Sequence, residues 1–291
     1  METTEESAAS VAIERPCLYL VATPIGNLGD ISLRALQVLR GVDLILAEDT
    51  RTSLRLLDRY TIRKPLEAFH QHNESARAEA LVGRMREGAL ALALVSDAGT
   101  PLLSDPGFPL VRAVLSAGLP VRAVPGASAL LAALSVSGLP CDRFAFEGFL
   151  PARSAARRSA LEALADDTRT LVFYESTHRI LATLADMEAI MGAQRPLVVA
   201  REITKLHETV YRGTVTEVRT HMTADPHACR GELVMVLGGA SMQADDGLAL
   251  RMLVALRGKL SARHAVEVVH ACTGYPRNKL YTHVLAGDEQ A

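Results

Sequence analysis

The sequence predicts an α/β protein with two domains and a small helical extension at its C-terminal end. Three observations support this class. In the first half of the chain, short apolar runs alternate with amphipathic segments, which is typical of a parallel sheet covered by helices. In the second half the apolar runs lie closer together, which indicates a mixed sheet. The length of 291 residues suits two domains with a small addition.

The first domain is expected over residues 15–124, after a loose acidic tail at 1–14 that lacks the pattern of a signal peptide. Apolar runs predict its strands at 18–22, 42–47, 65–69, 89–95 and 121–124. Amphipathic spacing predicts its helices at 32–39, through Leu54 and Leu57, at 75–86 and at 109–116. Because a helix falls between most successive strands, the strands are expected to run parallel.

A turn at 125–128 marks the expected junction with a second domain over residues 125–240. That domain begins with an apolar helix at 129–136, which is expected to be buried. Its remaining elements are predicted as strands at 143–146, 170–174, 197–200, 208–211 and 232–237, and as helices at 155–164 and 179–190. The polar stretch after Gly239 is typical of a linker, and residues 245–291 are expected to form a small helical domain.

Composition excludes several classes of protein. The formal net charge is -2, which argues against a globally basic nucleic-acid binder but not against a local basic patch. Aromatic residues make up 4% with no Trp, so a surface built on base stacking is not expected. The four cysteines form no CxxC pair, which argues against a disulfide framework or a zinc site and fits a reducing cytoplasm. No apolar stretch reaches the length of a membrane span.

Two loops that leave predicted strands combine glycine and proline with small residues. The sequence SDAGTPLLSDPG at 96–107 follows the strand at 89–95, and TPIGNLGD at 23–30 follows the strand at 18–22. In a parallel sheet, ligands bind at the loops that leave the carboxyl ends of strands. The alternative for the loop at 96–107 is an ordinary rigid turn between a strand and a helix, and the alternative for the loop at 23–30 is a turn capped by Asp30 or Ser32. Two such loops together favour a ligand site.

Charged segments supply candidates for chemistry, each with a plain structural alternative. The acids at 48–51 suit ribose binding or nucleophile positioning, but Asp49 also suits a helix cap. Glu175 and His178 suit proton transfer, whereas Ser176 or Thr177 beside them suits a helix cap. The charged segment at 201–208 suits binding of a polyanion, or lowering of the pKa of Lys205. The usual explanation for such a segment is a run of charges exposed to solvent. Basic residues at 153–158 suit phosphate contacts or a solvated helix face.

Several common signatures are absent. There is no GxGxxG after the first strand, no GxxxxGK[ST], no GxSxG and no HExxH. His70 and His72 lack a third ligand in the sequence and are a weak metal signal. From the residues alone, the protein is therefore a two-domain α/β protein with a ligand at the loops and no assigned chemistry.

Seven motifs in order nevertheless resemble one family. They are LVATPIGNL at 20–28, EDTR at 48–51, SDAGTP at 96–101 with SDPG at 104–107, PGASA at 125–129, GFLP at 148–151, REITKLHE at 201–208 and GE at 231–232. Together they resemble the 16S rRNA cytidine 2′-O-methyltransferases of the tetrapyrrole-methylase-like superfamily. The resemblance runs from Cys17 to Gly239, and the remaining tail resembles the helical C-terminal region of that family.

The resemblance implies a two-domain class III methyltransferase fold, S-adenosylmethionine in the interdomain cleft and a homodimer. It also implies 2′-O-methylation of a cytidine ribose in the decoding region of 16S rRNA within the small ribosomal subunit. The residues themselves assign no metal ligand and no membrane partner. Matching motif by motif, it places the cofactor against Thr23, Pro24, Thr100, Leu103, Ser128, Ala129 and Tyr174.

The candidates for proton transfer or charge stabilisation are Glu48, Asp49, Glu175 and Lys205. Lys205 would need a lowered pKa, which the neighbouring Arg201 is expected to provide. The residues expected to contact RNA are Arg51, Arg153, Arg157, Arg158 and Arg201. Two alternatives remain open: a methyltransferase of the same fold that acts on a tetrapyrrole or a protein side chain, and a non-catalytic ribosome-binding factor.

Overall fold

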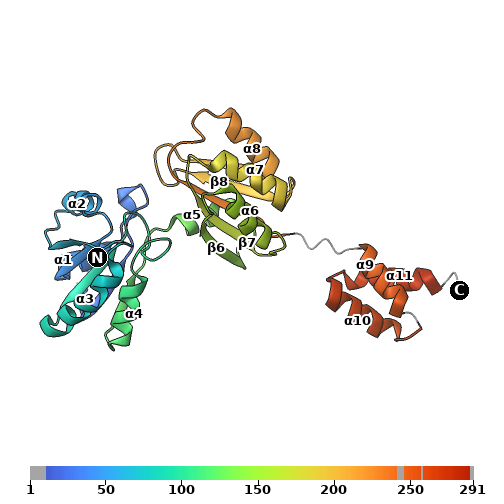
Figure 1. The fold of residues 1–291 in the computed structure, drawn as a ribbon, viewed down its shortest axis with the longest axis horizontal. Helices are drawn as coiled ribbons and strands as arrows, with labels where there is room; N and C mark the ends of the chain where they lie inside the picture. Colours follow the sequence, from blue (N-terminus) through green and yellow to red (C-terminus); the bar gives the residue numbers. More distant parts are fainter. Residues whose placement is uncertain (1–10, 241–245, 257, 289–291) are drawn as a thin grey trace, which may run out of the picture. The chain divides into compact units, whose positions relative to one another are not determined.

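The computed structural model describes residues 11–240, 246–256 and 258–288. Its contacts divide into two compact units (Figure 1). The first holds both sheets and runs to Ala165 and again over Arg169–Gly238, and the second holds Asp166–Thr168 with the chain from Gly239 onward. Both sheets thus belong to one unit, so the expected domain boundaries at 124 and 240 stay predictions.

The first sheet has five parallel strands in the order β3-β2-β4-β1-β5, as the alternating pattern predicts. They are β1 (Cys17–Val21), β2 (Leu44–Ala47), β3 (Leu66–Ala68), β4 (Ala91–Val95) and β5 (Val121–Val124). Every residue of β2 and β4 is buried, which explains why these strands read as unbroken apolar runs rather than alternating ones. All five strands end at the same edge of the sheet.

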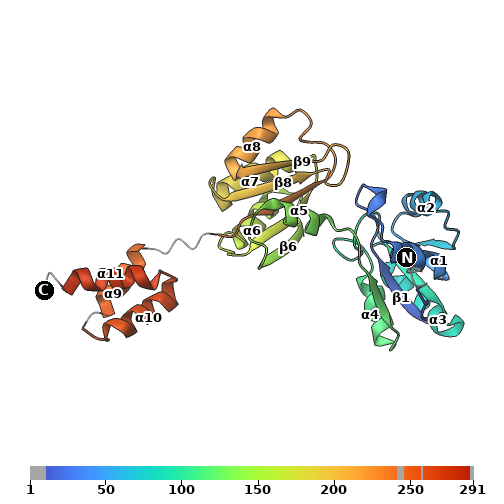
Figure 2. The same ribbon diagram turned by 180° about the vertical axis from the view of Figure 1, so that it is seen from behind.

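Helices cover both faces of this sheet (Figures 1 and 2). The helices α1 (Leu33–Gly41) and α2 (Thr50–Arg59) share an apolar cluster with alternate residues of β1, such as Tyr19. The helices α3 (Glu74–Gly88) and α4 (Phe108–Ser116) pack on the opposite face, where Leu18 points. Ser32 caps α1 and Asp49 caps α2 with side-chain oxygens, and a short 3-10 helix, η1 (Leu28–Asp30), precedes α1.

The second sheet has the order β6-β7-β10-β8-β9. Its strands are β6 (Phe144–Phe149), β7 (Thr170–Glu175), β8 (Pro196–Arg201), β9 (Thr209–Thr214) and β10 (Leu233–Leu237). Only β6 and β7 pair in parallel, and the other three pairs are antiparallel. The predicted mixed sheet is therefore confirmed, and β6, β7 and β8 all end at the edge where β10 begins.

The two faces of the second sheet are covered unequally. On one face lie α6 (Ser154–Ala163), α7 (Ile180–Met191) and α8 (Val215–Ala224), and on the other lies α5 (Ala129–Ser137). The prediction that α5 is buried is wrong for one side, because Leu131 on α5 is 55% exposed. The helix α8 was not predicted, because its apolar residues show no clear helical spacing. The capping box formed by Thr214 and Glu217 could have indicated where it begins.

The second unit contains three helices within its described residues: α9 (Asp246–Leu256), α10 (Ala262–Thr273) and α11 (Arg277–Asp288). They surround a small apolar cluster of their own that includes Leu253, Val266, Val269 and Leu280. The helical extension expected from the sequence is confirmed.

The N-terminal tail is more ordered than expected where it can be described. Residues 1–10 lie outside the described part of the chain. Val11 and Ile13 pack against the core of the first sheet, and Glu14 pairs with Arg122 at 2.9 Å. The segment 11–14 is therefore anchored rather than loose.

Some classes of site are not seen in the described residues. All four cysteines are free thiols. Over those same residues, no group of three or more His, Cys, Asp or Glu side chains is arranged to hold a metal ion. None of the helices within the described ranges is both long enough and apolar enough to cross a membrane.

Candidate active site

The loops that leave the first sheet are tied to one another at its carboxyl edge. Thr23 and Gly99 exchange two backbone hydrogen bonds with N···O distances of 2.9 and 3.1 Å, and the Thr23 hydroxyl donates to the Ser96 carbonyl at 3.2 Å. The Thr100 hydroxyl donates to the Ala127 carbonyl at 3.1 Å. Loops far apart in the sequence therefore form one wall, as expected from their places after parallel strands.

The same loop network reaches the residues that follow β2. The backbone N–H of Asp49 donates to an Asp97 carboxylate oxygen at 3.0 Å. This contact joins the motif at 48–51 to the loop at 96–107 and holds the Asp97 side chain in one orientation.

Loops from the second sheet form the opposite wall. Phe149 ends β6 and Tyr174 lies near the end of β7, and their rings meet edge to face with centroids 5.6 Å apart. Glu232 immediately precedes β10, which begins at this same edge. Both sheets thus present loops to the same space.

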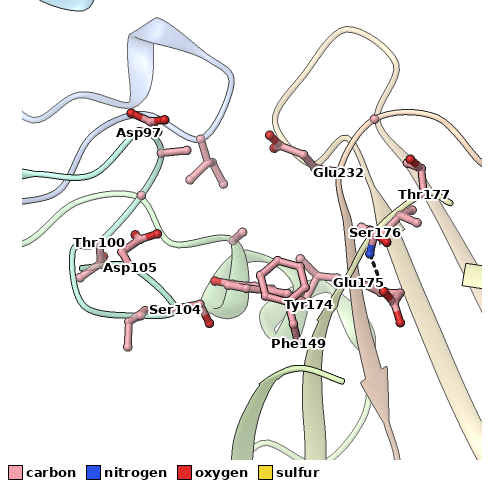
Figure 3. Close-up of a pocket in the computed structure, with 18 of the residues that line it drawn as sticks. Asp97, Thr100, Ser104, Asp105, Phe149, Tyr174, Glu175, Ser176, Thr177 and Glu232 are labelled. Atoms are coloured by element: carbon pink, nitrogen blue, oxygen red, sulfur yellow. Dashed lines mark hydrogen bonds between the residues drawn. The ribbon is translucent and has the colours of Figure 1, made fainter. Parts of the chain in front are cut away.

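A cavity of about 470 Å³ lies between these two walls (Figure 3). Residues from both sheets line it, including Ile25, Glu48, Asp97, Thr100, Leu103, Asp105, Ala129, Phe149, Tyr174, Thr177, Glu232 and Val234. Of the residues expected to touch a cofactor, Thr100, Leu103, Ala129 and Tyr174 line this cavity. The volume falls within the usual range for small-molecule sites, about 300–1,000 Å³.

A second cavity of about 310 Å³ adjoins the first. It is bounded by the loop after β1, the start of α2 and Lys205. The two cavities share four lining residues, Ile25, Asp97, Ala98 and Glu232. Thr23 and Pro24, which were expected to touch the cofactor, line this smaller cavity instead of the larger one.

The loop after β4 is held in an unfavourable backbone conformation. Leu102 and Ser104 have φ values of 77° and 69°, in the left-handed region that non-glycine residues rarely adopt. Each such residue costs roughly 1–3 kcal/mol, and strained residues of this kind cluster at functional sites. Gly99, with φ of 84°, lets the loop pass close to Ile25.

Lys205 is positioned by glycine and by two acids. Gly26 leaves room for the lysine stem, since a Cβ on Gly26 would collide with Lys205 Cγ. The Lys205 ammonium donates to Glu202 at 2.8 Å and to Glu232 at 2.9 Å. Burial opposes the charge, but the hydrogen bonds to these two carboxylates outweigh it and raise the pKa of Lys205.

The expected lowering of the pKa of Lys205 is therefore wrong. Arg201, which was expected to lower it, is 8% exposed and directs its guanidinium to the His207 carbonyl at 3.1 Å and the Thr209 hydroxyl at 2.9 Å. Lys205 stays a cation and cannot accept a proton. Arg201 is held inside the fold, so its expected contact with RNA is not supported by its position.

Three acids share the edge of the larger cavity. Burial raises the pKa of Glu48, of Asp97 and of Asp105, and for Asp105, with the nearby Glu48 charge contributing, it reaches about 6. Asp97 and Asp105 were not among the candidates chosen from the sequence, although both stand in the loop that follows β4. Asp97 lines both cavities, so it lies where their contents would meet.

Two of the candidate acids are paired with neighbouring arginines, although Glu175 also lines the larger cavity. Hydrogen bonds from Arg51 lower the pKa of Asp49 to about 2, and Asp49 lines neither cavity. The Glu175 side chain is fully buried and accepts hydrogen bonds from the Ser176 N–H at 2.6 Å and the Thr183 hydroxyl at 2.6 Å, with Arg179 paired at 2.8 Å. In Figure 3 its carboxylate turns away from Asp97 and Asp105. Neither acid is free to take a proton from a ligand.

The arginines expected to contact RNA divide into two groups. Arg157 and Arg158 both pair with Asp186, at 2.7 and 3.1 Å, and the Arg157 side chain is only 5% exposed. The expected role of Arg157 on the surface is therefore wrong, because its charge is used between α6 and α7. Arg51 and Arg153 are exposed, and their contact with RNA stays a prediction.

Features of the larger cavity fit a cofactor with an apolar body and polar ends. Leu103, Phe149 and Tyr174 supply apolar and aromatic surface, while Thr100 and the acids supply polar groups. Ser128, which was also expected to touch the cofactor, lines neither cavity. Its hydroxyl is buried and has no hydrogen-bond partner within the described structure, which is unusual for a buried hydroxyl.

Comparisons with known proteins add to this geometry. The family model of the tetrapyrrole (corrin/porphyrin) methylases matches residues 17–219. Ribosomal RNA small subunit methyltransferase I of Pasteurella multocida is 50% identical over 271 residues, which cover 92% of this chain and 96% of the relative. The protein of the same name from Escherichia coli O157:H7 is 47% identical over 270 residues, covering 92% and 94%.

Solved structures share the fold at lower identity. Uroporphyrin-III-C-methyltransferase from Thermus thermophilus superposes with a TM-score of 0.53 at 23% identity, over 77% of this chain and 94% of that one. Diphthine synthase superposes with a TM-score of 0.55 at 16% identity, over 76% and 90%. These likenesses confirm the fold class expected from the motifs and carry no conclusion about substrate.

Proposed function

Because this chain belongs to the tetrapyrrole (corrin/porphyrin) methylase family, we propose that it methylates the 2′-oxygen of a cytidine ribose in 16S rRNA, using S-adenosylmethionine. The observation that carries this proposal is identity of 47–50% with ribosomal RNA small subunit methyltransferases over nine-tenths of the chain. The cavity between the two sheets supports it, because loops from both walls meet there.

The residues of the larger cavity would hold the cofactor. Leu103 and Tyr174 would cover its adenine with apolar surface, and Thr100 lines the same cavity with a polar side chain. S-adenosylmethionine, when bound, supplies a methyl group already activated on a sulfonium. The protein therefore contributes mainly by positioning the acceptor oxygen and by removing its proton.

Asp97 is the side chain best placed to accept that proton. It lines both cavities, and burial raises its pKa, which makes its carboxylate a stronger base than an exposed aspartate. Balanced, the transfer would form a bond between the ribose 2′-oxygen and the methyl carbon, break the bond from sulfur to that carbon and release S-adenosylhomocysteine. The hydroxyl proton passes to the Asp97 carboxylate.

The RNA would meet the protein through a local surface, since the net charge of the chain is -2. Arg153 is an exposed cation, and Arg51, although it pairs with Asp49 at 2.7 Å, is 87% exposed, so both side chains would reach phosphates. A homodimer would double such contacts, and a folded ribosomal subunit in the cytoplasm would present the target nucleotide in a defined shape. We therefore propose that the two arginines contact RNA, that the protein is a homodimer and that it acts in the cytoplasm.

Methyl transfer to isolated small ribosomal subunits tests the proposal. Subunits from a strain that lacks this activity would be incubated with the protein and methyl-labelled S-adenosylmethionine, and the product mapped with nucleases. Label in a 2′-O-methylcytidine of the decoding region is the expected result. Cofactor binding without label in the subunit would instead indicate a tetrapyrrole or protein substrate, and absence of cofactor binding would indicate a non-catalytic ribosome-binding factor.

A further inference from the structure

The smaller cavity is distinct from the cofactor space but open to it along one boundary. Its four shared lining residues include Asp97 and Glu232, one from each sheet. In Figure 3 these two acids face each other from opposite walls. A group bound in one cavity would therefore meet a group bound in the other at this pair of carboxylates.

We propose that the smaller cavity receives the single nucleoside of rRNA that is to be methylated, turned out of the RNA chain and placed with its ribose at Asp97. This inference rests on the proposed function, because it names where the acceptor of that reaction binds. It assigns the loop after β1, the start of α2 and Lys205 to the acceptor rather than to the cofactor.

The size of the smaller cavity suits one nucleoside. At about 310 Å³ it lies at the lower end of the range for small-ligand sites, and it is too small for a base pair or a helical segment. Proteins that recognise RNA by sequence mostly read unstacked bases in loops and at ends, where a nucleotide can be splayed out. A target turned outward could enter the cavity together with its ribose, whereas a stacked nucleotide presents its 2′-hydroxyl only along the minor groove of the helix.

The lining of the smaller cavity is polar on the side of α2. The side chains of Thr52, Ser53 and Arg55 lie there, and Leu56 adds an apolar surface. Hydroxyls can pair with a base edge or with ribose, and a guanidinium suits the phosphate on either side of the nucleotide. Arg55 has no ion-pair partner among the described residues, so its charge is available for such a phosphate.

Lys205 acts as a positioning residue in this arrangement. Its stem lies across Gly26, and its ammonium holds Glu202 and Glu232 from the side of the second sheet. The lysine therefore fixes Glu232 at the boundary between the cavities. Its charge also balances the acids there, which limits repulsion between Glu232 and the phosphates of RNA.

A substitution that fills the smaller cavity separates acceptor binding from cofactor binding. Thr52 is exposed at the start of α2 and lines only the smaller cavity, so Thr52→Trp would place a large ring there with little risk to the core. Leu54→Trp is the matched control, because Leu54 is 50% exposed on the same helix and lines neither cavity.

Three readouts would be compared for the wild-type protein, Thr52→Trp and Leu54→Trp. The first is the Kd for S-adenosylmethionine from titration calorimetry. The second is methyl transfer to unmethylated small subunits. The third, made without cofactor, is protection of the target cytosine N3 from dimethyl sulfate in subunits bound by each protein. The third readout reports directly whether the base enters the protein.

The expected result is selective loss in Thr52→Trp. Its Kd for S-adenosylmethionine stays within about twofold of wild type, as for a substitution at an independent site. Its transfer rate falls about 100-fold, the usual scale for a displaced reacting group, and the target cytosine loses its protection. Leu54→Trp matches the wild type in all three readouts.

Other outcomes overturn the inference. If Thr52→Trp transfers methyl groups and protects the cytosine as the wild type does, the nucleoside binds elsewhere. If Thr52→Trp loses affinity for S-adenosylmethionine, the smaller cavity belongs to the cofactor. If the wild-type protein itself binds no cofactor or labels no RNA, the proposed function fails, which is separate from a failure confined to the variant.

Discussion

Two charged clusters that look alike in the sequence have different roles in the structure. Arg157, Arg158 and Asp186 form ion pairs between α6 and α7, with Arg157 and Asp186 largely buried. Lys205, Glu202 and Glu232 form ion pairs at the boundary of the two cavities, where Glu232 is mostly exposed. The first cluster joins two helices of the scaffold, and the second borders the space where ligands would bind.

The difference shows that charge density in a sequence does not distinguish structure from function. In the sequence, the segments at 153–158 and 201–208 both contain closely spaced basic residues that suit phosphate binding. The two segments differ in burial and pairing. The Arg157 guanidinium is buried and hydrogen-bonded to Asp186, whereas the Lys205 stem lies across Gly26 at a cavity wall. The backbone conformation also differs between the two clusters. Glu202 and Thr204 have left-handed φ values of 52° and 68°, as is common at functional sites, whereas α6 is a regular helix.

The largest expected effect on stability comes from the scaffold cluster. Arg157→Met leaves the Asp186 carboxylate without its buried partner and is expected to lower the free energy of unfolding by about 3–5 kcal/mol. The Kd for S-adenosylmethionine of the folded variant should stay near the wild-type value, because Arg157 lines neither cavity. Urea unfolding and titration calorimetry measure the two quantities. A variant as stable as wild type would contradict a structural role for the pair.

On the side of the cavities, Asp97→Asn should cause the largest loss of activity. Asparagine keeps an oxygen for the Asp49 N–H but cannot accept the ribose proton, so kcat should fall about 100-fold or more. The wild-type rate should rise with pH as Asp97 ionises, at a pH above its ordinary pKa of 3.8, because burial raises that pKa. Single-turnover rates over a pH series measure both. Unchanged kcat in Asp97→Asn would remove Asp97 from the reaction.

Lys205→Met should lower methyl transfer about tenfold while changing the free energy of unfolding by about 1 kcal/mol or less, since the ion pairs with Glu202 and Glu232 are partly exposed. Gly26→Ala offers a second way to displace the same side chain, because its added Cβ would collide with the lysine stem. Similar losses in both variants would locate the effect in the position of Lys205. Full activity in both would contradict its role at the cavity boundary.

A smaller effect is expected at Asp105. Its folded-state pKa of about 6 lies above the ordinary 3.8, so the native state binds more protons than the unfolded state between these values. Stability contributed by the protonated carboxyl is therefore lost as pH rises to about 6, and Asp105→Asn should raise Tm by about 2 °C at about pH 7.5. At about pH 4 the gain should vanish. A gain independent of pH would contradict this cause.

The smallest effect is expected at the exposed edge of the scaffold cluster. Arg158 also pairs with Asp186, but its side chain is 44% exposed, so Arg158→Ala should cost only about 0.2–1 kcal/mol in the free energy of unfolding. Comparison with Arg157→Met by the same urea titration isolates the contribution of burial. Equal losses in the two variants would show that burial does not decide the strength of this pair.

Much of the fold could be predicted from local patterns. Buried parallel strands such as β4 appear in the sequence as unbroken apolar runs. Turns that contain Gly and Pro separate these strands from the helices. The element that escaped prediction, α8, is polar over much of its length, and its start is signalled by a cap rather than by a period. The exposure of one side of α5 was also not predicted. In a helix that is apolar all round, the sequence does not distinguish residues that face the sheet from those that face solvent.

The site could be predicted only in part. Thr100, Leu103, Ala129 and Tyr174 could be placed at a ligand by their positions in motifs, and they do line one cavity. The proton acceptor could not be chosen, because the pairing of Glu175 with Arg179 and of Asp49 with Arg51 depends on side-chain orientation. The second cavity depends on contact between α2, the loop after β1 and Lys205, which lie far apart in the sequence.

The contrast between the two clusters can be tested most directly by measuring kcat and the free energy of unfolding for Lys205→Met and Arg157→Met in parallel. Lys205→Met is expected to lose activity and keep its stability, whereas Arg157→Met is expected to lose stability and keep its activity once corrected for the folded fraction. Full activity in Lys205→Met, or loss of activity in folded Arg157→Met with unchanged stability, would contradict this contrast.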